Sequence, residues 1–495
     1  MSDSQCYSGK ICKLNNKSVD FSAEIKFDQY YKSIITVYGV TWNYIKQFDN
    51  VEECSTVMLL KNGEYISIVD FYVKEKKGSS KKESDKLVYD NYITVVLVSS
   101  NVIKGSSWIL SRQTFSELCM KVTDGYELIG NCPYDFDIGY ESMILCEKIE
   151  IPIRKEIICV NTMIGELQFE ALPKYNFSKD LFMIGFSHCI RFRPSNPINI
   201  KEIRVMLKKI TDFFSLLCGE IITINELSLM DNANSMYKYI GFCNFPKEKL
   251  HILEKKEIDS TRFKSNSLFK ITDFPDLEKA LNYWFKYYEC LYNAQQAYGR
   301  ILLDEEMKIA SVNKYLAAMQ LIEGVSQAYA DEDQEILEFN NKKQKIMSKL
   351  DDESDKELID KGLQLSGITF RKAVISFFLD VLRSFGQITK SAFTRQNECL
   401  IDKIVNDRNF YTHSSKRIKA KLSFDETMNI AALCKDFYRI FILKKAGIPD
   451  SLLQYRLGHD RVFIYVFNNL LGMQIKIDGE KPEFDKKMSF FNDPK

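Results

Sequence analysis

Residues 274–301, FPDLEKALNYWFKYYECLYNAQQAYGRI, mark the point where the pattern of the chain changes. Apolar and aromatic side chains recur here at steps of three and four residues, the spacing that lines one face of an α-helix. The same spacing returns in later stretches, among them residues 309–331 and 424–447. We therefore predict an all-α helical bundle over residues 275–475 and a loosely held tail over residues 476–495.

The residues before this change alternate between apolar and polar side chains. In residues 19–27, VDFSAEIKF, every second side chain is apolar, as in a strand with one buried face. An Asn-Gly pair at residues 62–63 gives a hairpin-turn signal between two such runs. We predict a β-rich antiparallel region over residues 1–270, with one helix within residues 198–220 and an exposed polar loop at residues 74–86. The expected fold class is α+β, multidomain.

The composition excludes several classes of protein. Of the 495 residues, 45% are hydrophobic and 27% are charged, which is typical of globular domains rather than disordered segments. The net charge of +1 gives no overall field that would favour nucleic acid or a membrane, so any such surface must be local. No stretch resembles a signal peptide or a membrane span. We expect a soluble, cytoplasmic protein with no membrane partner.

The thirteen cysteines are scattered, and no two of them form a C-x-x-C pair. Zinc ribbons and dithiol redox sites need such a pair, so we expect buried free thiols in a reducing compartment. Because the chain also has only four histidines, we expect no metal site and no cofactor.

The candidate site lies in residues 406–417, NDRNFYTHSSKR. Apolar residues before it form the inward stripe of a helix: Leu400, Ile401, Ile404 and Val405. Continuing that stripe by one turn reaches Arg408, where the pattern predicts an apolar residue. Since an unpaired buried guanidinium is costly, we expect Arg408 to contact an internal carboxylate, an interface or a bound anion.

His413 follows Arg408 by five residues. In a regular helix this separation is about 140° of rotation and about 7.5 Å of rise, so the two residues would not share a face. We therefore predict that the helix ends or distorts near Tyr411, or that the two groups converge with their copies from a second subunit. The run THSSKR lacks strong helix formers and suits such an ending.

An arginine and a histidine together can cleave RNA without a metal ion. A neutral histidine, whose ordinary pKa is about 6.5, can remove the proton of a ribose 2′-hydroxyl. The arginine fork can bind the phosphate oxygens and stabilise charge in the transition state. Asp407, Asn409 and Tyr411 are candidate supporting residues, and Asn409 can position the phosphate or the histidine. A basic run just beyond can hold the RNA backbone: Lys416, Arg417, Lys419 and Lys421.

Two other features have simpler interpretations. His188 lies near Arg191 and Arg193, which could form a basic edge that contacts RNA, but we interpret it as a histidine at the end of a strand. The aromatic residues of the stretch 282–298 could stack on bases. Because they recur at helical spacing, we interpret them as core or dimer interface.

The RNFYTH stretch at residues 408–413 resembles the R-x(4–6)-H motif of HEPN domains, in which a polar residue commonly follows the arginine. Its gap of four residues is the shortest that the motif allows. The resemblance is closest to the Apea-like HEPN group, because residues 315–333 look like an early helix of that group and residues 437–453 like the helix after the motif. Residues 7–27 and 206–229 are similar to the β-rich N-terminal domain of those proteins and to the segment before their HEPN bundle.

The resemblance implies an endoribonuclease of prokaryotic antiviral defence that halts growth by cleaving host RNA, often tRNA, as in abortive infection. It implies a homodimer in which both motifs line one cleft. It also implies RNA cleavage that leaves 2′,3′-cyclic phosphate and 5′-hydroxyl ends. Arg408 and His413 would be the catalytic pair, and Asn409 the accompanying polar residue. Glu323 matches an acidic position of the group and would be the partner of Arg408. The β-rich region would sense infection or restrain the ribonuclease, with a phage protein as the candidate trigger.

Two alternatives belong to other functional classes. A non-catalytic HEPN adaptor would have the same fold, and would dimerise through the bundle while the β-rich region binds a phage or host protein. A nucleotidyl-transfer enzyme would need paired carboxylates and a Gly-rich phosphate loop, and neither is visible in the sequence.

Overall fold

The structure is a computed structural model in which contacts between residues divide the chain into two units. A β-rich unit comprises Met1–Thr211 and Ile222–Arg262, and a helical unit comprises Asp212–Ile221 and Phe263–Lys495. The residues that the structure describes are 6–14, 17–27, 33–41, 44, 55–83, 86–99, 101–109, 112–123, 128–129, 157–177, 182–240, 269–329, 334–362, 369–386, 389–413, 419–458, 460–471, 475–478 and 481–484.

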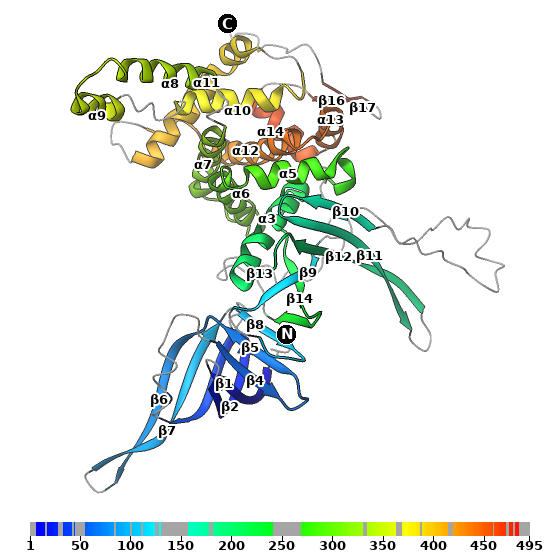
Figure 1. Ribbon diagram of the computed structural model, residues 1–495. Coiled ribbons are helices and arrows are strands. Elements are labelled where there is room, and N and C mark those ends of the chain that lie inside the picture. The colour runs from blue at the N-terminus through cyan, green and yellow to red at the C-terminus, as the bar shows by residue number, and fades with distance from the viewer. Residues whose placement is uncertain are drawn as a thin grey trace, which may run out of the picture. The chain divides into compact units, whose positions relative to one another are not determined.

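Strands make up most of the β-rich unit (Figure 1). They are β1 (Cys6–Leu14), β2 (Lys17–Phe27), β3 (Ser33–Thr41), β4 (Ser55–Leu60), β5 (Tyr65–Val69), β6 (Tyr72–Glu83), β7 (Lys86–Ser99), β8 (Asn101–Gly105), β9 (Thr114–Val122), β10 (Ile157–Thr162), β11 (Gly165–Phe177), β12 (Phe182–Pro194), β13 (Ile198–Asn199), β14 (Ile224–Asp231) and β15 (Met236–Ile240). Within the described residues they form one sheet in the order β10-β11-β12-β9-β14-β15-β8-β5-β4-β1-β2-β3-β7-β6, and β13 pairs with β9.

The alternating sequence runs form strands because one face of the sheet is buried. In β2, Phe21, Ala23 and Ile25 are at most 7% exposed and belong to one apolar cluster. The Asn-Gly pair at residues 62–63 connects β4 to β5 as predicted, and Gly63 has a φ of 83°, which favours glycine. The predicted antiparallel β-rich region is therefore confirmed.

Residues 74–83 and residue 86 of the polar segment form strand rather than loop, so the loop prediction was wrong for them. They lie in the β6–β7 hairpin, where Lys76 is opposite Val95 and Lys82 is opposite Leu87. Because β6 is the last strand in the sheet order, it has a sheet neighbour on one side only among the described residues. Lysines are common on such edge strands because they discourage pairing with another chain. The polar composition therefore reflects an edge strand.

The predicted helix within residues 198–220 is α3 (Ile200–Cys218). Its C-terminal end belongs to the helical unit, where the Arg439 guanidinium donates hydrogen bonds to the carbonyl oxygens of Leu216, at 2.8 Å, and Leu217, at 2.7 Å. A cation at this end of a helix satisfies free carbonyls and complements the helix dipole. Gly219, at a φ of 71°, follows the helix, and a Cβ there would lie 2.7 Å from Arg439.

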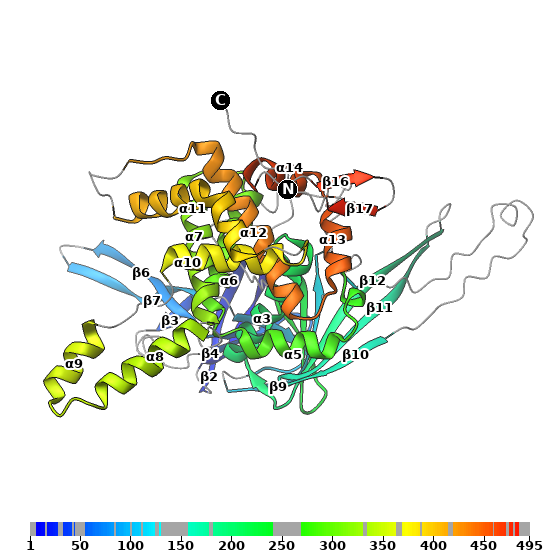
Figure 2. The same cartoon turned by 90° about the horizontal axis from the view of Figure 1, so that it is seen from above.

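The helical unit contains ten further α-helices among the described residues (Figure 2). They are α5 (Leu277–Tyr287), α6 (Tyr292–Glu306), α7 (Val312–Ala328), α8 (Gln334–Met347), α9 (Glu353–Gly362), α10 (Phe370–Leu382), α11 (Lys390–His413), α12 (Phe424–Lys445), α13 (Asp450–Gly458) and α14 (Arg461–Leu471). Helix α7 packs against α6 and α12, and α10 contacts α7, α11 and α12. The predicted α+β class with a C-terminal helical bundle is thus confirmed.

The tail prediction needs a correction. Strands β16 (Ile475–Asp478) and β17 (Lys481–Phe484) form an antiparallel two-stranded sheet after α14. Ile475 and Ile477 alternate with polar residues, so a period of two was present but too short to stand out. The rest of the predicted tail lies outside the described residues.

Aromatic residues of the stretch 282–298 form much of the core of the helical unit. Trp284 and Tyr298 are fully buried, and Tyr298 packs against Tyr438 of α12 with ring centroids 5.1 Å apart. The Tyr438 hydroxyl donates to Gln295 Oε1 at 3.0 Å. Tyr292, in contrast, is 46% exposed. The interpretation of this stretch as core rather than a base-stacking surface agrees with this burial.

Candidate active site

Helix α11 carries the RNFYTH motif at its C-terminal end. Its only non-helical backbone among the described residues is at Asn397, with φ −110° and ψ 15°. The Asn397 side chain donates to the carbonyl of Phe393 at 3.1 Å. The helix then continues through Tyr411 to His413, so the prediction of an end or distortion near Tyr411 was wrong.

Side-chain contacts hold the last turn of α11 in helical form. Thr412 Oγ1 donates to the carbonyl of Arg408 at 2.7 Å, within the same turn. The Tyr411 ring packs edge-on against Tyr315 of α7, with centroids 6.1 Å apart. The Tyr315 hydroxyl donates to the carbonyl of Ile404 at 3.0 Å. These contacts outweigh the weak helix propensity of the final residues.

A continuous helix separates the two motif residues. With regular backbone, positions 408 and 413 differ by about 140° around the axis and by about 7.5 Å along it. The side chain of His413 lies outside the described part of the structure. The remaining alternative from the sequence is convergence with a second copy of the motif.

The Arg408 guanidinium is held by α7 and α10. Its Nη2 lies 2.5 Å from Oε1 of Glu323 on α7, and its Nη1 donates to Asn409 Oδ1 at 3.1 Å. Its central carbon lies 5.3 Å from the ring centroid of Phe370, at the start of α10. The carboxylate contact expected at Arg408 is therefore present. Among the described residues, these bonds use two of the five N–H donors of the guanidinium, and others can bind an anion.

Asp407 supports the backbone rather than Arg408. Its side chain is fully buried and accepts hydrogen bonds from the backbone N–H of Lys421, at 2.8 Å, and of Leu422, at 2.9 Å. Asn406 Nδ2 donates to Asp407 Oδ1 at 2.9 Å and to the carbonyl of Lys419 at 2.8 Å. These bonds fasten the end of α11 to the residues that precede α12.

The proposed RNA-binding lysines are only partly within the described structure. Lys419 and Lys421 are exposed, so both ammonium groups can reach a ligand. Lys416 and Arg417 lie outside the described residues. Ser423 caps α12, since its side chain accepts from the backbone of Glu426 and the Glu426 carboxylate accepts from the backbone of Ser423.

Two residues of this region, Phe370 and Asn406, are not marked as functional by any sequence pattern. Phe370 follows the N-cap residue Thr369 and has the appearance of an ordinary core residue in sequence. Its contact with Arg408 depends on how α10 packs, so no local pattern signals it. Asn406 was detectable only as a polar neighbour of the motif.

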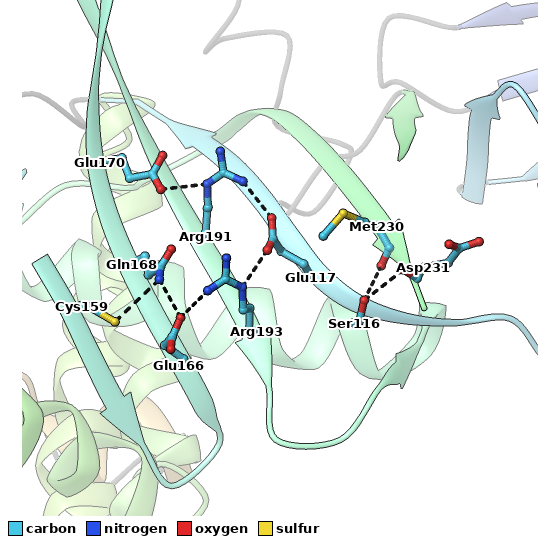
Figure 3. Close-up of polar contacts among 10 residues, drawn as sticks. All are labelled: Ser116, Glu117, Cys159, Glu166, Gln168, Glu170, Arg191, Arg193, Met230 and Asp231. Carbon is cyan, nitrogen blue, oxygen red and sulfur yellow. Dashed lines mark hydrogen bonds and ion pairs between the residues drawn. The ribbon is translucent and has the colours of Figure 1, made fainter. Parts of the chain in front are cut away.

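Arg191 and Arg193, the other basic candidates, are paired with carboxylates. Figure 3 shows Glu117 bridging them, with Oε1 2.9 Å from Arg191 Nη1 and Oε2 2.8 Å from Arg193 Nε. Glu166 Oε1 lies 2.7 Å from Arg193 Nη1, and Glu170 Oε1 lies 3.0 Å from Arg191 Nε. His188, on the adjoining part of β12, is 8% exposed. This pairing favours a structural role for this cluster over an edge that contacts RNA.

Family models match most of the chain. The ApeA N-terminal domain 1 family matches residues 7–284, more than half of the sequence, and the Apea-like HEPN family matches residues 316–452. The chain therefore belongs to the family of proteins with an ApeA-type N-terminal domain and an Apea-like HEPN domain, a class of nuclease-type defence proteins. Arg408, His413 and Glu323 all fall within the HEPN match. Searches of curated proteins and of solved structures gave no match.

The described part of the chain lacks two features. No helix there is both long and apolar enough to cross a membrane. No group of three or more His, Cys, Asp or Glu residues in this part of the chain is placed to hold a metal ion.

Proposed function

We propose that this protein is an endoribonuclease of anti-phage defence that cleaves RNA without a metal ion. The observation that carries the proposal is the fixed position of Arg408 between Glu323 and Phe370, next to Asn409. A guanidinium already oriented by a carboxylate and a ring needs little reorganisation when a phosphate arrives. Host RNA, with tRNA as the leading candidate, is the proposed substrate, and abortive infection the proposed outcome.

The chemistry follows from the two motif side chains. The neutral imidazole of His413 accepts the proton of a ribose 2′-hydroxyl, and the 2′-oxygen attacks the adjacent phosphorus. Arg408 donates to the non-bridging phosphate oxygens as negative charge builds on them. The bond from phosphorus to the 5′-oxygen then breaks, that oxygen takes up a proton from water, and His413 releases its proton to solvent. The products are a 2′,3′-cyclic phosphate and a 5′-hydroxyl end.

The continuous helix supports a site made by two subunits. Positions 408 and 413 lie on different sides of α11, so one helix does not present both to the same phosphate. In a two-fold dimer, Arg408 of one copy can face the partner subunit's His413. The homodimer is therefore part of the proposal.

A mixing experiment tests this site. The Arg408→Ala and His413→Ala chains, each inactive alone, are co-expressed and the dimers are purified. If each site combines one residue from each chain, mixed dimers contain one intact site, and random pairing should restore about a quarter of the wild-type activity. A site within one chain would restore none. The readouts are the RNA cleavage rate of the purified dimers and sequencing of RNA ends from the cells that express them.

A comparison of RNA ends from cells that express wild type or His413→Ala separates the nuclease from the adaptor. An adaptor would leave the same RNA ends in wild-type and His413→Ala cells, even at toxic expression or with the trigger present.

For the β-rich unit we propose that it senses infection and restrains the nuclease, with a phage protein as the trigger. A chain lacking residues 1–211, which keeps the end of α3 that Arg439 binds, should then be more toxic than the full chain, and equal toxicity would count against restraint.

A further inference from the structure

A pocket of about 360 Å³ opens between helices α7, α10 and α12 of the helical unit. Its wall includes three cationic side chains, those of Arg383, Lys390 and Lys445. Hydroxyl groups of Ser326 and Ser376 also line it. Neither the motif nor the mechanism above uses this pocket.

The cations of the pocket are accessible and partly oriented. Lys445 Nζ lies 5.0 Å from the ring centroid of Tyr329 and 5.9 Å from that of Phe441, so two aromatic faces guide its ammonium. Arg383 is 53% exposed and pairs with Asp380 at 3.3 Å. Lys390 is exposed as well.

The charge of the pocket is net positive. Asp380 is the one acidic side chain among the lining residues, against three cations. Burial raises the pKa of the Asp380 carboxyl, while Arg383 and Lys445 act to lower it. Cations beside hydroxyl groups in a concave site are the groups that bind phosphate oxygens.

The pocket adjoins the candidate active site along two helices. Ser326 lies three residues after Glu323 on α7, and Ala373, another lining residue, lies three residues after Phe370 on α10. Glu323 and Phe370 are the residues that hold Arg408. The pocket therefore begins about one helical turn, or about 5 Å, from the residues around the guanidinium.

We propose that this pocket binds a phosphate of the RNA strand next to the phosphate that is cleaved. Arg383, Lys390 and Lys445 supply the charge, and Ser326 and Ser376 supply hydroxyl donors. This inference rests on the proposed ribonuclease function, because it names a further subsite for the same substrate. The contact is to the RNA backbone and is independent of base sequence.

The test measures RNA binding at several salt concentrations. A labelled single-stranded RNA of ten nucleotides is titrated into full-length His413→Ala protein, with or without Lys390→Gln or Lys445→Gln. Each pocket substitution should weaken binding about threefold to tenfold and reduce the slope of log affinity against log salt by about 0.7. Lys279→Gln, an exposed lysine of α5 outside the pocket, is the matched control and should change neither.

The outcomes are distinguishable. If wild-type protein cleaves RNA but the pocket variants bind as tightly as the control with the same salt slope, the inference fails and the ribonuclease proposal stands. If wild-type protein neither binds nor cleaves RNA, both fail. A further arm titrates inorganic phosphate and adenosine monophosphate. If the pocket substitutions abolish binding of these small anions but leave RNA binding unchanged, the pocket takes a free phosphate compound and the assignment to RNA is overturned.

Discussion

Arg408 and Glu323 form an ion pair between α11 and α7, with Nη2 and Oε1 2.5 Å apart and the two side chains 24% and 31% exposed. A pair with this exposure contributes little to stability, since surface ion pairs give about 0 to 1 kcal/mol. Its consequence is orientation, because the carboxylate holds the guanidinium in one direction while leaving part of its donor surface accessible.

Arg408→Lys should lower the rate of RNA cleavage about a hundredfold or more without unfolding the protein. Lysine keeps the charge but lacks the planar fork that binds two phosphate oxygens. Glu323→Gln should cause a smaller loss, because an amide can still accept a hydrogen bond but no longer supplies charge. Single-turnover cleavage rates and thermal melts measure both effects. Wild-type cleavage by Glu323→Gln would contradict the orienting role.

Asp407→Ala should destabilise the helical unit by about 2 to 4 kcal/mol, because it removes the acceptor of the buried Leu422 N–H group and of the partly buried Lys421 N–H group. Asp402→Ala on the same helix is the control. Asp402 pairs with Arg371 and is 50% exposed, so its loss should cost about 1 kcal/mol or less. Urea unfolding followed by circular dichroism gives both values. Equal losses of unfolding free energy in the two variants would show that the burial of Asp407 does not determine its contribution to stability.

Arg193→Gln should leave RNA cleavage and RNA affinity unchanged. The guanidinium of Arg193 is paired with two carboxylates, Glu117 and Glu166, so its positive charge is already balanced and attracts a phosphate only weakly. The substitution should instead lower the melting temperature, because Glu117, which is 5% exposed, loses a partner. A clear loss of RNA affinity would revive the basic edge as an RNA-contacting surface.

Glu305 gives the helical unit a dependence on pH. Burial raises the pKa of its carboxyl. The Nζ atoms of Lys435 and Lys314, each 2.9 Å from a carboxylate oxygen of Glu305, lower this pKa by more than burial raises it, so the net pKa is below the usual range. Such a group stabilises the fold above its unfolded pKa of about 4.3 and loses this effect as the pH falls through its folded value. The stability difference between wild type and Glu305→Gln should therefore be constant near neutral pH and shrink below about pH 4.3.

Urea unfolding at a series of pH values checks this prediction. Glu353→Gln serves as the comparison, because the Glu353 side chain is 87% exposed and should give almost no difference at any pH. A difference for Glu305→Gln that stays constant down to about pH 3 would contradict the linkage.

Sequence periodicity predicted the elements whose environment is simple. Residues 19–27 alternate because β2 has one buried face. Residues 74–83 were misjudged since an edge strand carries the same lysines as a loop. The end of α11 was misjudged because Tyr315, on another helix, stabilises a turn of weak propensity.

The candidate site was predictable from sequence only in part, because some of its contacts depend on how separate helices pack. Arg408 stood out because it replaces an apolar residue in a helical stripe, and the family resemblance pointed to Glu323. The partners of Asp407, fourteen and fifteen residues further along the chain, follow only from how α11 and α12 are joined. Phe370 and the cationic pocket arise from the packing of α7, α10 and α12, which no single stretch of sequence reports.

The bonds from Asp407 to Lys421 and Leu422 have a consequence for how this protein can vary. They close the base of the segment that runs from the end of α11 to the start of α12. Because closing a loop costs only about 0.6 kcal/mol more for each doubling of its length, residues can be inserted or lost between positions 413 and 419 without moving Arg408. The length of this segment can thus change while the proposed catalytic arginine keeps its position.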